Sequence, residues 1–132
     1  MSADENLELV RRLVDGINTN DIPRDLVTDD FELSNATTAV TDATYHGYEG
    51  GLRWRADLTD VVEDAHFHVD EVIAATDDYL VIPTRLVGRG ALSGAPVDLR
   101  WMSVFWFRDG KIARAVGYNT PGAALEAVGL SE

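Results

Sequence analysis

The segment WMSVFWFRDGK, residues 101–111, constrains the fold more than any other part of the chain. A β-strand with one solvent-exposed face alternates apolar and polar side chains. Here the two faces would carry two largely apolar sets, Trp101, Ser103, Phe105 and Phe107 on one and Met102, Val104 and Trp106 on the other. We therefore expect a strand that is covered on both faces and runs into a tight turn at RDGK.

The length of 132 residues predicts a single domain over residues 1–132. The formal net charge of −12 disfavours nucleic acids and anionic membrane surfaces as partners. No cysteine is present, which excludes disulfides, thiolate nucleophiles and cysteine-bound zinc. The acidic N-terminus lacks a signal-peptide pattern and no segment reaches the roughly 20 apolar residues of a membrane span, so we expect a cytoplasmic protein.

Hydrophobic periodicity predicts an α+β architecture in which helices pack on one face of a curved sheet. Ser2 and Glu5 have the spacing of a capping box, which predicts a helix start. Pro83 interrupts a strand pattern and indicates an edge position or a bulge there. The expected elements are helices from about residue 3, at 23–27 and from Gly47, strands at 31–35, 65–76, 79–91, 97–107 and 112–119, and a closing helix at 121–130.

Three stretches in this order carry a resemblance to a known family: GYEGGLRWRADLTDVVED, SVFWFRDGKI and AALEAVGL. The chain resembles the SnoaL-like family of the nuclear transport factor 2-like superfamily from about Asn6 to Leu130. Ketosteroid isomerase, SnoaL-type polyketide cyclases, limonene-epoxide hydrolase and scytalone dehydratase belong to this superfamily. The resemblance implies a cone-shaped, curved antiparallel sheet with helices on its concave face (a cystatin-like α+β barrel), a pocket inside the cone and a second subunit on the other sheet face.

Strand parity then sorts the side chains between the two faces of the sheet. The odd-numbered positions of the segment 99–105 are expected to face the inside of the cone, on the same sheet face as the apolar positions of the neighbouring strands. The candidate ligand-binding residues are Phe31, Leu33, Asn35, Trp54, Leu58, Val62, Phe67, Ile82, Thr84, Leu86, Leu99, Trp101, Ser103, Phe105, Gly117 and Asn119.

The outward positions form a second apolar set, Met102, Val104, Trp106, Val116 and Tyr118. Large apolar groups are costly to leave in water. We therefore expect a homodimer through the outer sheet face. The alternative is that the C-terminal segment covers this face within one chain.

The resemblance also implies a carboxylate general base seven residues after the glycine of the DGKI turn, but counting from Gly110 gives Gly117. The positions that match the arginine and aspartate of the epoxide hydrolases are Thr84 and Leu86, so that activity is not expected. His46 and Tyr45 remain as candidate proton carriers at the mouth of the pocket. His46 lies beside Gly47 at a helix start, where a loop or capping role is favoured over catalysis.

No metal or other cofactor is expected. The pair His66 and His68 has a ligand-like spacing on one strand face, yet no third ligand can be named, so both are expected to be exposed strand residues. Taken together, the sequence predicts a pocket protein for a small, mostly apolar molecule. Its reaction, where there is one, would be a cofactor-independent isomerisation, cyclisation or dehydration. The alternative is a non-catalytic ligand-binding or dimerisation module.

Overall fold

The computed structural model describes residues 2–35 and 44–130, with the side chain of Asn35 outside that description. Its helices are α1 (Ala3–Thr19), α2 (Gly47–Val61) and α3 (Pro121–Ala127), with a 3-10 turn at Arg24–Leu26. Its strands are β1 (Val27–Asn35), β2 (Tyr45–His46), β3 (Val62–Val69), β4 (Ala74–Ala75), β5 (Tyr79–Gly90), β6 (Pro96–Arg108) and β7 (Lys111–Tyr118). None of the helices in these ranges is long and apolar enough to cross a membrane.

The strands form one strongly curved sheet in the order β2-β1-β7-β6-β5-β3, with β4 added beside β5. The sheet is mixed, because β1 runs parallel to β7 while the other pairs are antiparallel. The expectation of a purely antiparallel sheet is wrong at this one pair. Most of the chain lies between β1 and β7, which gives the long connection that parallel neighbours need.

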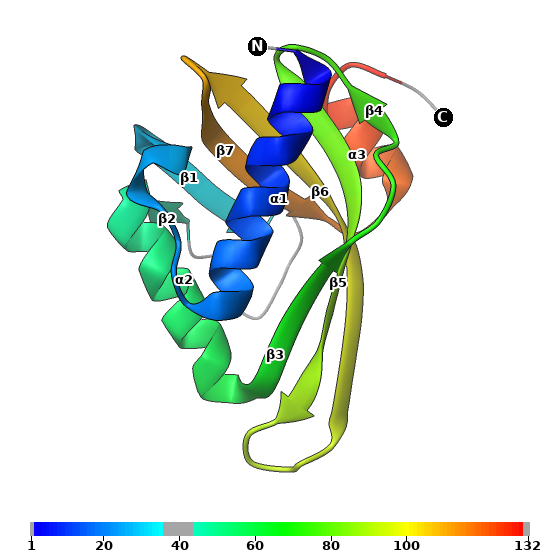
Figure 1. The fold of residues 1–132 in the computed structure, drawn as a ribbon. Coiled ribbons are helices and arrows are strands. Elements are labelled where there is room, and N and C mark those ends of the chain that lie inside the picture. The colour runs from blue at the N-terminus through cyan, green and yellow to red at the C-terminus, as the bar shows by residue number, and fades with distance from the viewer. Residues whose placement is uncertain (1, 36–43, 131–132) are drawn as a thin grey trace.

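The α+β cone is confirmed, with α1 and α2 over the concave face and α3 on the opposite face (Figure 1). The Ser2–Glu5 capping box forms at the start of α1. The RDGK turn also forms as expected, because Asp109 and Gly110 both have positive φ and so make a two-residue hairpin turn.

The two faces of β6 are buried in two separate clusters. Phe105 packs with Phe67, Leu80, Ile82 and other residues under the helices. Met102 and Val104 pack instead with Val81 and with Ala124 of α3. The expected parity is therefore confirmed, and the apolar character of both faces is explained by helices on both sides of the sheet.

The outer face is covered by α3 within the same chain, which is the alternative that the sequence left open. Met102, Val104 and Val116 are buried in the single chain. Tyr118 and Trp106 are half-buried, and the guanidinium of Arg114 lies 4.7 Å from the centre of the Trp106 ring. Three of the five residues of this patch are therefore shielded from water without a second subunit, and the homodimer stays a prediction.

Two segments differ from the expected elements. The helix expected from Gly47 is α2, which ends at Val61, and β3 begins at Val62. Val62 is therefore a strand residue paired with Gly90 and does not belong to the helix. β-Branched residues favour strands over helices, which accounts for the early switch. Along one edge of β5 the paired strand is β3 up to Thr84 and β4 from Val81. Pro83 lies between these two paired stretches, so neither of them needs the N–H that proline lacks.

Asn18 fastens α1 to β3. Its side-chain amide donates to the carbonyl oxygen of Phe67 at 3.0 Å, and its side-chain oxygen accepts from the N–H of Phe67 at 2.8 Å. Both polar groups of one strand residue are thus satisfied by one side chain, and Phe67 is fixed beneath α1.

We expect Asn18→Ala to lower the free energy of unfolding by about 1–3 kcal/mol, because it leaves two partly buried peptide groups without partners. Urea denaturation measures the change. The adjacent Thr19→Ala is the control, since Thr19 is exposed and should change stability by less than about 0.5 kcal/mol. Equal stability of the two variants would contradict the proposed role of Asn18.

Candidate ligand-binding cavity

An inner cavity of about 80 Å³ lies between the helices and the concave face of the sheet. Its lining residues come from α1, α2 and five strands: Leu13, Val14, Ile17, Leu33, Ser34, Trp54, Phe67, Val69, Thr84, Trp101, Ser103, Phe105, Ala115, Val116 and Gly117. No lining residue from the described part of the chain carries an ionisable side chain. The cavity therefore offers an apolar wall with a few neutral polar groups.

An outer groove of about 260 Å³ adjoins this cavity. It is lined by Trp54, Leu58, Phe67, Leu86, Leu99, Arg100, Trp101, Gly117, Tyr118 and Asn119. Leu99 is 54% exposed, so the groove leaves a large apolar side chain in contact with solvent. The groove is more polar than the cavity, because it includes Arg100 and Asn119.

Three aromatic residues line both spaces and form the wall between them. The ring centres of Trp54 and Phe67 are 5.4 Å apart, and those of Phe67 and Trp101 are 6.1 Å apart in an edge-to-face arrangement. Contacts at such distances stabilise the rings against one another. We call Trp54, Phe67 and Trp101 the aromatic wall.

The polar groups of the cavity form a short chain of hydrogen bonds. The indole N–H of Trp101 donates to the Oγ of Ser103 at 3.1 Å. The hydroxyls of Ser103 and Thr84 are 2.8 Å apart, and either of them can donate. Both hydroxyl residues are buried. A ligand in the cavity would meet this neutral pair as its principal polar contact.

The structure brings most of the expected pocket residues together. Leu33, Trp54, Phe67, Thr84, Trp101, Ser103, Phe105 and Gly117 line the inner cavity, and Leu58, Leu86, Leu99 and Asn119 line the outer groove. Phe31 lines a smaller space of about 20 Å³ under α2. Val62 and Ile82 are buried but line none of these three spaces, and the side chain of Asn35 lies outside the described residues.

Sequence reasoning missed the contribution of α1 to the cavity. Leu13, Val14 and Ile17 lie on its buried side and reach the lining. Their helical spacing is visible in the sequence, but spacing alone identifies a buried helix face and not the sheet region that this face covers.

Tyr45 and His46 are located away from the cavity. Neither lines the inner cavity or the outer groove in the described structure. The Tyr45 hydroxyl donates to Asp57 Oδ2 at 2.8 Å, which raises the pKa of Tyr45 above its usual value. The His46 side chain is 70% exposed, and its Nδ1 is 3.7 Å from a carboxylate oxygen of Glu32. A proton-carrying role for either residue stays a prediction, which these positions do not support.

The chain matches the family model of the SnoaL-like domain over residues 10–115. It belongs to the SnoaL-like domain family. No curated protein matches the chain.

Solved structures share the fold of this SnoaL-like domain at low sequence identity. One is a Catenulispora acidiphila protein with a ketosteroid isomerase-like fold, in complex with trimethylamine, with 19% identity, a TM-score of 0.72 and 93% of each chain covered. A Jannaschia sp. CCS1 protein, whose proposed role is SnoaL-like polyketide cyclase, has 23% identity and a TM-score of 0.72, over 88% of this chain and 85% of that one. TerC, co-crystallised with polyporic acid, has 19% identity and a TM-score of 0.73, over 92% and 96%.

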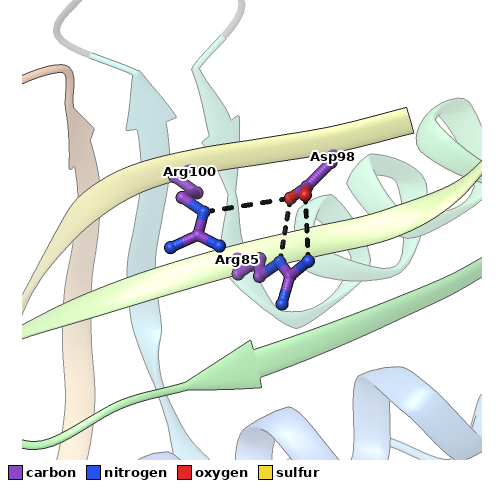
Figure 2. A network of polar contacts seen from close by, with 3 residues as sticks. All are labelled: Arg85, Asp98 and Arg100. Carbon is purple, nitrogen blue, oxygen red and sulfur yellow. Dashed lines mark hydrogen bonds and ion pairs between the residues drawn. The ribbon is translucent and has the colours of Figure 1, made fainter. Parts of the chain in front are cut away.

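An ion-pair network lies on the outer face of the SnoaL-like sheet, next to the groove (Figure 2). Arg85 donates two hydrogen bonds to Asp98, at 2.8 and 2.9 Å, and the Nε of Arg100 is 4.0 Å from the same carboxylate. The hydrogen bonds from Arg85 lower the pKa of Asp98 below its usual value, and those to Asp98 raise the pKa of Arg85.

The lowered pKa of Asp98 fixes the sign of a pH effect on stability. The ionised carboxylate favours the folded state, so its contribution is present above the unfolded pKa of about 4 and is lost as the pH falls through the lower folded pKa. Because the three side chains are well exposed, the contribution is small and sensitive to salt.

We expect Arg85→Gln to lower the melting temperature at pH 7, and we expect the difference from the wild type to shrink below about pH 4. Thermal melts between pH 3 and pH 7 at low salt measure it. Arg24→Gln is the control, since the Arg24–Glu49 pair at 2.8 Å is more exposed and does not involve Asp98, although the Arg24 guanidinium also lies 4.5 Å from the centre of the Tyr48 ring. A difference that is the same at pH 3 and pH 7 would exclude the Asp98 carboxylate as its source.

Proposed function

We propose that this SnoaL-like domain binds a small, neutral, mostly apolar molecule in the inner cavity and the adjoining groove. The observation that carries the proposal is the lining of the cavity, which combines apolar walls with the Ser103–Thr84 hydroxyl pair and lacks ionisable groups in the described residues. A buried charge without a partner is strongly disfavoured, so a neutral ligand part fits this environment best.

The comparisons support the binding part of the proposal. Two proteins of the same fold hold small molecules in their crystals, trimethylamine in one and polyporic acid in the other. Small-molecule binding is therefore compatible with this fold. The identity of such ligands does not carry over, because one fold hosts many functions.

Catalysis receives less support than binding. A cofactor-independent isomerisation, cyclisation or dehydration needs a group that takes up or delivers a proton next to the substrate. Tyr45 and His46 were the candidates, and both lie outside the lining of the cavity and the groove. The binding function is thus the one that the geometry of the described residues favours.

The second candidate is a non-catalytic module in which the cavity is only a gap left by an otherwise filled core. The small volume of the inner cavity, about 80 Å³, favours it. A cavity of about 150 Å³ is needed to hold a molecule such as benzene. The homodimer through Met102, Val104, Trp106, Val116 and Tyr118 is compatible with both candidates, and a molar-mass measurement in solution tests it.

We expect a ligand screen with neutral terpenoids, aromatic polyketide fragments and steroids to find molecules that raise the melting temperature. Saturation at 100 times the dissociation constant would add about 2.7 kcal/mol to the stability. Ala115→Val should abolish the shift, because its two additional methyl groups would occupy the cavity that Ala115 lines.

The matched control is Ala127→Val, since Ala127 is exposed at the end of α3, far from the cavity lining. It should keep the full ligand-induced shift. If no ligand stabilises the wild type, or if Ala115→Val responds like the control, the binding proposal fails and the filled-core candidate takes its place.

A further inference from the structure

Neither of the two spaces is a complete ligand pocket by itself. The inner cavity measures about 80 Å³ and the outer groove about 260 Å³. Ligand pockets begin at roughly 300 Å³, a volume that the two spaces reach only when they are joined. The aromatic wall of Trp54, Phe67 and Trp101 lies between them, so a ligand that fills both spaces at once requires one of these rings to move.

Phe67 is the least movable ring of the wall. It is buried, and both of its peptide groups are held by the side chain of Asn18. Trp54 is carried on α2 and packs against Phe67 at 5.4 Å. Movement of Phe67 would disturb the core of the sheet, and movement of Trp54 would break a closer ring contact than the 6.1 Å between Phe67 and Trp101.

Trp101 is the ring of the wall that lies next to a stretch of β6 that is unpaired on its β7 side. Its side chain is half-buried, and a single hydrogen bond, from its N–H to Ser103, holds the indole. The pairing of β7 with β6 ends at Tyr118, opposite Met102, so no strand of the described chain continues beside Trp101 on that side. The indole can therefore rotate toward solvent, where water satisfies its N–H.

We propose that the ligand displaces the Trp101 indole and donates a hydrogen bond to the Oγ of Ser103 in its place. This inference rests on the proposed binding function and names its ligand class, an apolar molecule that carries a neutral hydrogen-bond donor such as a hydroxyl group. Without ligand, Ser103 Oγ holds the Trp101 indole in the aromatic wall by a hydrogen bond. With ligand, the same oxygen accepts a hydrogen bond from the ligand.

The hydrogen bonds of Ser103 support a ligand that carries a hydrogen-bond donor. In the closed state Ser103 Oγ accepts from Trp101 and shares one further hydrogen bond with Thr84. When the indole leaves, the buried Ser103 Oγ loses one of its two hydrogen bonds, which is unfavourable unless the ligand supplies another donor. A pure hydrocarbon would leave only the bond with Thr84, whereas a hydroxyl group restores the second one.

The test uses 2-naphthol and 2-methoxynaphthalene, which differ only in the hydroxyl hydrogen and the methyl group that replaces it. We expect the wild-type protein to bind 2-naphthol about three- to tenfold more tightly, the value of one ordinary hydrogen bond. Dissociation constants come from ¹H–¹⁵N NMR titrations. The indole N–H signal of Trp101, identified by its loss in Trp101→Phe, should shift on binding.

Two variants separate the Trp101–Ser103 hydrogen bond from the ligand–Ser103 hydrogen bond. Ser103→Ala should bind the two probes with similar affinity, because the oxygen that accepts both hydrogen bonds is removed. Trp101→Phe should bind both probes more tightly than the wild type does and should keep the preference for 2-naphthol, because only the hydrogen bond from the indole is lost. Trp106→Phe, on the outer face beside Arg114, is the control and should behave like the wild type.

Three outcomes would each overturn this inference while the binding function stands. They are equal affinity of the wild type for the two probes, a preference for 2-naphthol that persists in Ser103→Ala, and binding that leaves the Trp101 signal unshifted. Absence of binding of either probe to the wild type and to Trp101→Phe would overturn both.

Discussion

The burial of β6 on both of its faces is the constraint on which the rest of the structure depends. Phe105 needs cover on the concave side of the sheet, and Met102 and Val104 need it on the convex side. The first requirement places α1 and α2 over the concave face and so creates the cavity next to Trp101 and Ser103. The second brings α3 onto the outer face, where Ala124 is fully buried. At roughly 25 cal/mol per Å² of apolar surface removed from water, both sets of contacts contribute strongly to folding.

The same constraint determines the chemistry that the cavity can offer. A space enclosed by the hydrophobic core of a small domain is lined by core residues, and its polar groups must satisfy one another. The Thr84–Ser103–Trp101 chain meets this requirement without any charge. The charged side chains of the described residues lie instead on the surface, as in the network of Arg85, Asp98 and Arg100. Recognition by shape and by one neutral hydrogen bond is what such an interior does best.

Much of the fold follows from the sequence, because strand parity and helix caps are local properties. The alternation from Trp101 to Phe105, the Ser2 capping box and the Asp109–Gly110 turn each depend on neighbouring residues and are confirmed. The errors concern long-range pairing. The parallel alignment of β1 with β7, the covering of Met102 by α3 and the contribution of Leu13 to the cavity depend on where distant segments meet. Local patterns carry little information about such contacts.

The location of Tyr45 and His46 shows why a site is harder to predict than a fold. A residue type suited to proton transfer is visible in a sequence, whereas its distance from the cavity is not. Tyr45 is directed to Asp57, and His46 faces Glu32 in solvent. Ser103 has a less reactive side chain, yet its position at the aromatic wall connects it to both the cavity and the ring that closes it. Position within the fold, more than residue chemistry, is therefore the reason for proposing Ser103 as the polar contact of a ligand.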